Sequence, residues 1–83
     1  MKTLMKAKAV VYTKPNCVQC NATFKALDKH GVEYETVDLL DHPEMVEHFK
    51  AQGHLAAPIV QTSSGTWAGY KPDKIKALAQ QAA

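Results

Sequence analysis

The chain has 83 residues, of which 46% are hydrophobic, and a net charge of +2 from ten basic and eight acidic side chains. This length predicts one small, compact domain over residues 1–83 and excludes a second one. The hydrophobic content excludes a disordered chain. The weak and dispersed positive charge argues against a nucleic-acid partner. No apolar run reaches the length of a transmembrane helix, so we expect no membrane partner.

The start of the chain does not look like an export signal. Residues 1–6 carry some positive charge, but a short mixed segment without a small-residue cleavage site follows them. We therefore expect a cytoplasmic protein, in which thiols are kept reduced. In that compartment, two cysteines separated by two residues indicate redox or metal chemistry before a structural disulfide.

Residues 7–13 predict a first strand because they are rich in β-branched and aromatic side chains. Val10 and Val11 are adjacent and both apolar, so both faces of this strand should be covered. Pro15 cannot continue a strand ladder and ends the element.

A helix is expected to begin at about Cys17. Cys20, Phe24 and Leu27 then fall on one apolar stripe, and Gly31 is a stop signal at the far end. The partial alternation of residues 32–39 predicts a second strand. A strand, a helix and a strand in succession imply a parallel pair with a right-handed crossover.

The second half of the chain predicts a helix, a hairpin and a last helix. Asp41 is expected to cap the first of these helices, with Glu44 at capping-box spacing and Gly53 as the stop. Residues 59–62 and 66–69 flank a glycine-containing turn and predict a β-hairpin. The last helix opens at residues 71–73, and its apolar stripe is formed by Ile75, Leu78, Ala79 and Ala82. The predicted order is β-α-β-α-β-β-α.

The position of Cys17 at a helix start predicts a reactive thiolate. The first N–H groups of a helix lack intrahelical partners and carry partial positive charge, which lowers a cysteine pKa from about 8.5 to about 3.5–7.5. Lys14 is close in sequence and adds positive charge. Cys20 lies on the same helix face but inside the first turn, where we expect it to be less exposed and less ionised.

These positions predict a division of labour between the two sulfurs. Cys17 attacks a disulfide of a partner and forms a mixed disulfide, and Cys20 then attacks Cys17 and releases the reduced partner. No bound cofactor is needed, because the redox-active group is the Cys17–Cys20 disulfide itself.

Several alternatives remain for the cysteine pair. It can be a buried structural pair, part of a metal or iron–sulfur module, or part of a non-catalytic interaction module. Zinc needs four ligands, but the chain has no second C-x-x-C, and two of its histidines are six residues apart, outside the usual spacing. We therefore expect no metal. The candidate ligands besides the cysteines are His30, His42, His48 and His54.

Three stretches together resemble the NrdH-redoxin family of glutaredoxin-like proteins, within the thioredoxin superfamily. They are residues 12–20, 57–60 and 67–73. The C-V-Q-C pair matches the family, whereas ordinary glutaredoxins usually carry C-P-Y-C and thioredoxins W-C-G-P-C. The stretch 67–73 is similar to the family's W-S-G-F-R-P-D segment and is the more specific match. It departs from the family at Ala68, where serine is usual.

The resemblance implies an α/β thioredoxin fold, with a four-stranded mixed sheet flanked by three helices. It implies that Pro58 is cis and that Ala57 lies beside the C-x-x-C with its backbone free to pair with a substrate strand. Trp67 has two interpretations, partner contact or packing over the last helix. The substrate-binding set expected from these considerations is Lys14, Val18, Gln19, Ala57, Pro58 and Trp67.

The resemblance also implies a role in deoxyribonucleotide synthesis. The partners would be the large subunit of the class Ib ribonucleotide reductase, which receives electrons, and thioredoxin reductase, which supplies them from NADPH. Glutaredoxins hold glutathione partly with an acidic pair near the last helix, but here Lys71-Pro72 follows Tyr70. This favours the flavoprotein as the electron source. A glutathione-dependent glutaredoxin remains the alternative.

Overall fold

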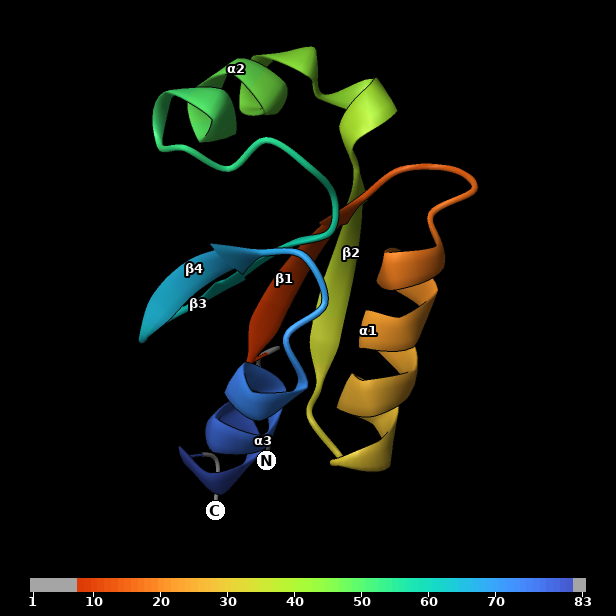
Figure 1. Ribbon diagram of the computed structural model, residues 1–83, viewed down its shortest axis with the longest axis vertical. Coiled ribbons are helices and arrows are strands. Elements are labelled where there is room, and N and C mark those ends of the chain that lie inside the picture. Colours follow the sequence, from red (N-terminus) through yellow and green to blue (C-terminus); the bar gives the residue numbers. More distant parts are fainter. Residues whose placement is uncertain (1–7, 82–83) are drawn as a thin grey trace, which may run out of the picture.

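The computed structural model describes residues 8–81 and contains a four-stranded mixed sheet (Figure 1). The strands lie in the order β2-β1-β3-β4, with β1 parallel to β2 and the other two neighbouring pairs antiparallel. The predicted element order and sheet are confirmed. Ala7 and Ala82, which the sequence assigned to the first strand and last helix, lie outside the described residues. The strands are β1 (Ala9–Thr13), β2 (Tyr34–Asp38), β3 (Ile59–Thr62) and β4 (Gly65–Ala68).

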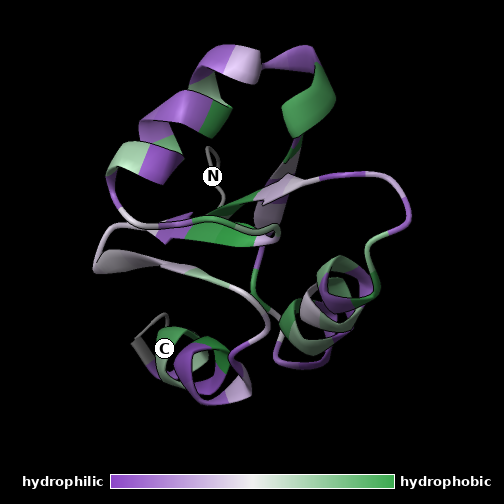
Figure 2. Cartoon of the chain, turned by 45° about the horizontal axis from the view of Figure 1, so that its top comes forward, coloured by the Kyte–Doolittle hydropathy of each residue, from purple (hydrophilic) through white to green (hydrophobic). Residues whose placement is uncertain are grey.

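Three α-helices cover the two faces of the sheet. They are α1 (Val18–Lys29), α2 (Pro43–Ala51) and α3 (Pro72–Gln81). Figure 2 shows the sheet between α2 on one side and α1 with α3 on the other. This layered arrangement is the thioredoxin-like fold that the family resemblance implies.

The adjacent valines of β1 face opposite layers. Val11 belongs to the larger core cluster, on the α1 and α3 side, and Val10 packs at the edge of the smaller cluster, on the α2 side. In the smaller cluster the rings of Tyr12 and Phe49 meet edge to face, with centroids 4.7 Å apart. The prediction that both faces of this strand are covered is confirmed. The buried larger cluster consists of Ala9, Val11, Leu27, Val32, Val60, Trp67, Ile75 and Leu78.

The start of α2 differs from the prediction. A 3-10 turn, η1 (Leu39–Asp41), precedes the helix, and His42 is the N-cap without a side-chain capping bond. The carboxylate of Asp38 instead accepts the N–H of Leu40 at 2.8 Å and caps the turn. The predicted cap at Asp41 is therefore wrong, because the extra turn places Asp41 at its end rather than immediately before the helix.

Candidate active site

Cys17 is the N-cap of α1 and holds the helix start through its own sulfur. Its backbone is extended, with φ −107° and ψ 106°, and its Sγ accepts the N–H of Cys20 at 3.1 Å. The carbonyl of Cys17 accepts the N–H of Asn21 at 3.2 Å, the first bond of the helix. The sulfur therefore faces an N–H group that a thiolate would bind with a stronger, charge-assisted hydrogen bond.

A tight turn delivers Cys17 to that position. β1 ends at Thr13, and Asn16 adopts a left-handed conformation with φ +57° just before the cysteine. Asparagine tolerates this region better than most residues. The short turn therefore leads directly from the central strand to the helix start, as the sequence predicted.

The two cysteines form a disulfide in the structure, with their Cα atoms 5.2 Å apart. Cys17 is 8% exposed and Cys20 is 1% exposed. The predicted difference in exposure is therefore confirmed. Cys17 is thus the more accessible residue of the pair, and attack by Cys17 with resolution by Cys20 fits this difference.

The Ala57–Pro58 peptide bond is cis, as the family resemblance implies. Pro58 is buried, and its carbonyl accepts the N–H of Gly69 at 2.7 Å. Within residues 8–81, the backbone N–H and C=O of Ala57 make no hydrogen bond. An added strand would find both groups without a partner from this part of the chain.

Gln19 connects the helix start to a distant loop. Its Oε1 accepts the backbone N–H of Tyr70 at 3.1 Å, across 51 positions of sequence. Because Gly69 bonds to Pro58 and Tyr70 bonds to Gln19, two consecutive N–H groups join the cis-proline loop to α1. The sequence placed Gln19 in the substrate-binding set and missed this structural contact.

The remaining predicted site residues differ in exposure. Val18, beside Cys17, is 82% exposed. Lys14 is also exposed, and its side chain makes no hydrogen bond or ion pair within residues 8–81. Trp67 is 8% exposed and packs in the core cluster with Ile75 and Leu78 of α3. Of the two interpretations of Trp67, the structure supports packing. Its place in the substrate-binding set gains no support from this position.

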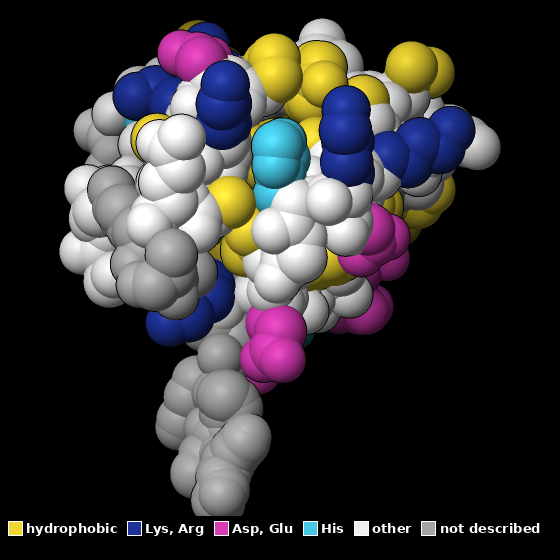
Figure 3. Space-filling model, turned by 90° about the horizontal axis from the view of Figure 1, so that it is seen from below, with side chains coloured by type: hydrophobic (Ala, Val, Ile, Leu, Met, Phe, Trp, Pro, Cys, Tyr) yellow, Lys and Arg dark blue, Asp and Glu magenta, His cyan; other side chains and the backbone are white. Residues whose placement is uncertain are grey.

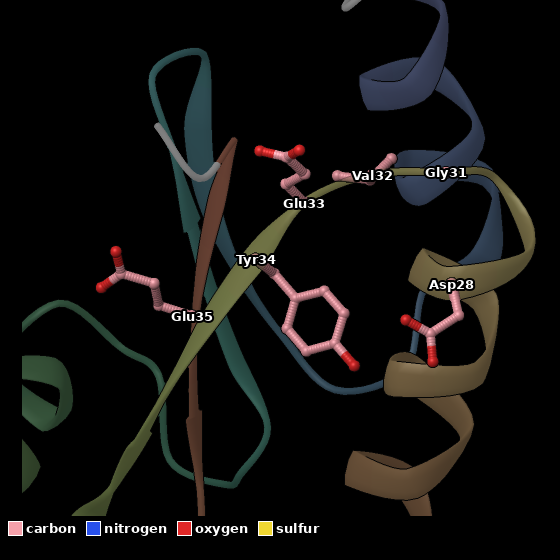
Figure 4. A pocket seen from close by; sticks show the side chains of 6 residues that line it. All are labelled: Asp28, Gly31, Val32, Glu33, Tyr34 and Glu35. Atoms are coloured by element: carbon pink, nitrogen blue, oxygen red, sulfur yellow. The ribbon is translucent and has the colours of Figure 1, made fainter. Parts of the chain in front are cut away.

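A hollow lined by acidic residues lies at the C-terminal end of α1, away from the cysteines. It has a volume of about 590 Å³ and includes Asp28, Glu33, Tyr34 and Glu35 in its lining. Figure 4 shows the Tyr34 ring pointing from β2 toward α1, with the Asp28 carboxylate on the side of its hydroxyl. Burial raises the pKa of Tyr34, and the neighbouring charge of Asp28 raises it further.

Residues 8–81 contain no candidate set of metal ligands. No group of three or more histidine, cysteine, aspartate or glutamate side chains comes together there. None of the helices in this part of the chain is long and apolar enough to cross a membrane.

Comparison with known proteins decides the family. The glutaredoxin family model matches residues 9–61. The chain is 38% identical to the glutaredoxin-like protein NrdH of Salmonella typhimurium, over 82% of this chain and 84% of that one. It is 32% identical to the NrdH protein of Lactococcus lactis, over 83% of this chain and 96% of that one. The chain belongs to the NrdH group of the glutaredoxin family.

The solved structure of NrdH-redoxin from Escherichia coli agrees with this assignment. It superposes with a TM-score of 0.80 and 36% identity, covering 84% of this chain and 92% of that one. A glutaredoxin from Archaeoglobus fulgidus, at 22% identity and a TM-score of 0.73, shares the fold. As an NrdH-like protein with the Cys17–Cys20 pair, the chain is a thiol–disulfide oxidoreductase.

Proposed function

We propose that this NrdH-like protein carries electrons to the large subunit of a class Ib ribonucleotide reductase in the cytoplasm. The observation that carries the proposal is the placement of Cys17, whose sulfur caps α1 and which as a residue is more exposed than Cys20. A thiolate there would be stabilised by the helix N-terminus and would still reach a partner. The resemblance to NrdH proteins supports this choice of client.

The proposed transfer moves two electrons by thiol–disulfide exchange. The Cys17 thiolate attacks the reductase's disulfide and forms a mixed disulfide, releasing one client sulfur as a thiolate that takes up a proton. Cys20 then loses its proton and attacks Cys17, so that the second client sulfur leaves. The client disulfide ends as a dithiol, and the Cys17–Cys20 dithiol ends as the disulfide present in the structure.

The surface around Cys17 offers two features for docking a client. Val18 is 82% exposed and presents an apolar side chain beside the reactive sulfur. Ala57 has a backbone N–H and C=O without hydrogen bonds within residues 8–81, as an added peptide strand would require. Val18 and Ala57 are therefore the proposed client-contacting residues, with Lys14 as a nearby positive charge. Gln19 and the buried Pro58 hold this surface in place through their hydrogen bonds to Tyr70 and Gly69.

We propose thioredoxin reductase, using NADPH, as the electron source. Lys71 and Pro72 follow Tyr70 where glutathione-dependent relatives hold glutathione with an acidic pair, so the tripeptide should bind poorly. The NrdH-redoxin of Escherichia coli has a thioredoxin-like activity profile. The same preference is expected of this chain.

The electron source is tested by offering each reductant separately to the oxidised protein. One mixture contains NADPH and thioredoxin reductase, and the other contains NADPH, glutathione and glutathione reductase. We expect rapid NADPH consumption and appearance of free thiols only in the first. Equal or faster reduction by glutathione would replace this assignment with a glutathione-dependent glutaredoxin.

The client is tested with a class Ib ribonucleotide reductase that receives electrons from no other source. Wild-type protein with NADPH and thioredoxin reductase should sustain formation of deoxyribonucleotides, and Cys17→Ser should not. If the wild type is reduced by the flavoprotein but supports no turnover, the oxidoreductase assignment stands and the client is a different disulfide protein.

A further inference from the structure

A hollow of about 330 Å³ lies between α1 and the loop that leads into α3. One of its walls is the face of α1 that carries Lys25 and Lys29, and Tyr70 with Pro72 forms the other. We call this hollow the basic groove. None of the residues described so far as site residues lines it, which separates it from the cysteine pair. Its lining is Ala22, Lys25, Ala26, Lys29, His30, Tyr70 and Pro72.

The charged side chains that line the basic groove are all basic. Lys25 and Lys29 are four residues apart on α1, a like-charged pair that destabilises an isolated helix. Neither forms an ion pair within residues 8–81, and the groove lining contains no acidic residue. Lys71, between the two residues of the opposite wall, is also exposed. An anionic ligand would relieve the repulsion between these cations.

Several acidic residues line a different hollow beside α1, which the basic groove does not include. The second hollow beside α1 is lined by Asp28, Glu33 and Glu35, so the two sides of this helix carry opposite charge. Figure 3 shows lysine side chains on both sides of a histidine on the face seen from below, with acidic side chains farther from the histidine. An acidic partner would therefore be steered to one side of α1 and repelled from the other.

The basic groove is connected to the redox site by a defined contact. Tyr70, which lines the groove, donates its N–H to Gln19 inside the C-V-Q-C motif. At about 1.5 Å per residue, Lys25 and Lys29 lie roughly 12–18 Å along the helix axis from Cys17. An extended peptide advances about 3.3 Å per residue, so it spans this distance with about four to six residues.

We propose that the basic groove binds an acidic segment of the redox partner while its disulfide is attacked by Cys17. The segment carries carboxylates about four to six residues from the attacked cysteine. Lys25 and Lys29 contact the carboxylates, and the partly exposed Tyr70 ring packs against the segment. This inference rests on the proposed function, since it assumes that Cys17 reduces a partner's disulfide.

The test uses two pairs of synthetic peptides that all contain the same intramolecular disulfide. In one pair, three positions four to six residues C-terminal to the disulfide are glutamates in one peptide and glutamines in the other. The second pair carries the same three residues on the N-terminal side of the disulfide. The rate constant for oxidation of the pre-reduced protein is measured for each peptide at low and high salt.

Two double charge reversals are compared with the wild type. Lys25→Glu with Lys29→Glu changes the basic groove, and Lys8→Glu with Lys50→Glu makes the same change in net charge on exposed residues outside its lining. We expect the wild type and the control variant to prefer a glutamate peptide by about three- to tenfold at low salt. The groove variant should lose or reverse this preference, and high salt should reduce it.

The outcomes distinguish failure of the groove proposal from failure of the proposed function. If the wild type reduces glutamate and glutamine peptides at equal rates, the basic groove has no role although the oxidoreductase function stands. A control variant that loses the preference as fully as the groove variant would mean that net charge alone acts, which also overturns the proposal. If the wild type reduces no peptide, the proposed function itself fails. All variants should reduce the glutamine peptide at the same rate, which verifies that they are folded.

Discussion

The side chain of Gln19 accepts a hydrogen bond from the N–H of Tyr70 at 3.1 Å, although 51 positions separate them. The preceding N–H, that of Gly69, bonds to the carbonyl of Pro58 at 2.7 Å. The segment between β4 and α3 thus contacts both the C-V-Q-C motif and the cis-proline loop. The middle of the motif therefore has a structural task besides any contact with a client.

Replacement of Gln19 by methionine is expected to lower the free energy of unfolding by about 1 kcal/mol, because methionine has a similar length and helix propensity but cannot accept this hydrogen bond. For a domain of this size, that loss corresponds to a fall in Tm of about 4–8 °C. Thermal unfolding of the oxidised protein measures it. Gln19→Glu keeps an acceptor oxygen and should retain most of the stability. Equal losses in both variants would show that the hydrogen bond is not the cause.

Replacement of Cys20 by serine is expected to trap the partner on Cys17. Cys17 can still attack, but the internal thiol that resolves the mixed disulfide is gone. Because intramolecular attack has a high effective concentration, turnover should fall on the order of 100-fold. Electrophoresis without reductant measures the trapped complex, and Cys17→Ser is the matched control that should form none. Normal turnover by the Cys20→Ser variant would contradict the assigned roles.

The local features of the redox site could be predicted from the sequence. The strand ends before Pro15, the helix begins at about Cys17, and Gly31, with φ +69°, follows its end. Each of these signals acts within a few residues, so no tertiary information is needed to interpret it. The order of exposure of the two cysteines also follows from their places in the first helical turn.

The long-range features could not be predicted in the same way. Nothing local to Gln19 indicates that its side chain meets Tyr70, since the contact depends on how α1 and α3 pack on one face of the sheet. For Trp67, the sequence alone favours neither partner contact nor packing against the last helix, because the choice depends on how α3 packs in the core. Asp41 has the correct spacing for a capping box, but the preceding Asp38 caps an additional turn that no pattern signalled.

Thr23 is the buried polar residue of α1, and its Oγ1 has no hydrogen-bond partner among the described residues. An unsatisfied buried hydroxyl costs about 1–3 kcal/mol, and valine has nearly the same shape and helix propensity. Thr23→Val should therefore raise the free energy of unfolding by about 1 kcal/mol. Urea unfolding of the oxidised protein measures the change as a higher midpoint with an unchanged slope.

The control for this change is Thr23→Ser, which keeps the hydroxyl and removes the methyl group. Because a buried methyl contributes about 1 kcal/mol, this variant should be less stable than the wild type. Opposite shifts in the two variants would assign the cost to the hydroxyl. A valine variant that is less stable than the wild type would mean that the hydroxyl is satisfied in solution.

Alkaline pH should destabilise the protein through Tyr34. Burial first, and the Asp28 carboxylate second, raise its pKa above the ordinary value of about 10, so the folded chain holds the phenolic proton more tightly than the unfolded chain. This contribution to stability is complete below the unfolded pKa and is lost as pH rises from that value through the folded pKa. Tyr34→Phe preserves the ring that stacks on Phe24 and should flatten the decline of stability in this range. Asp28→Asn should lower the Tyr34 pKa, so that tyrosinate absorbance appears at a lower pH in a titration. An unchanged titration in the asparagine variant would rule out Asp28 as a cause.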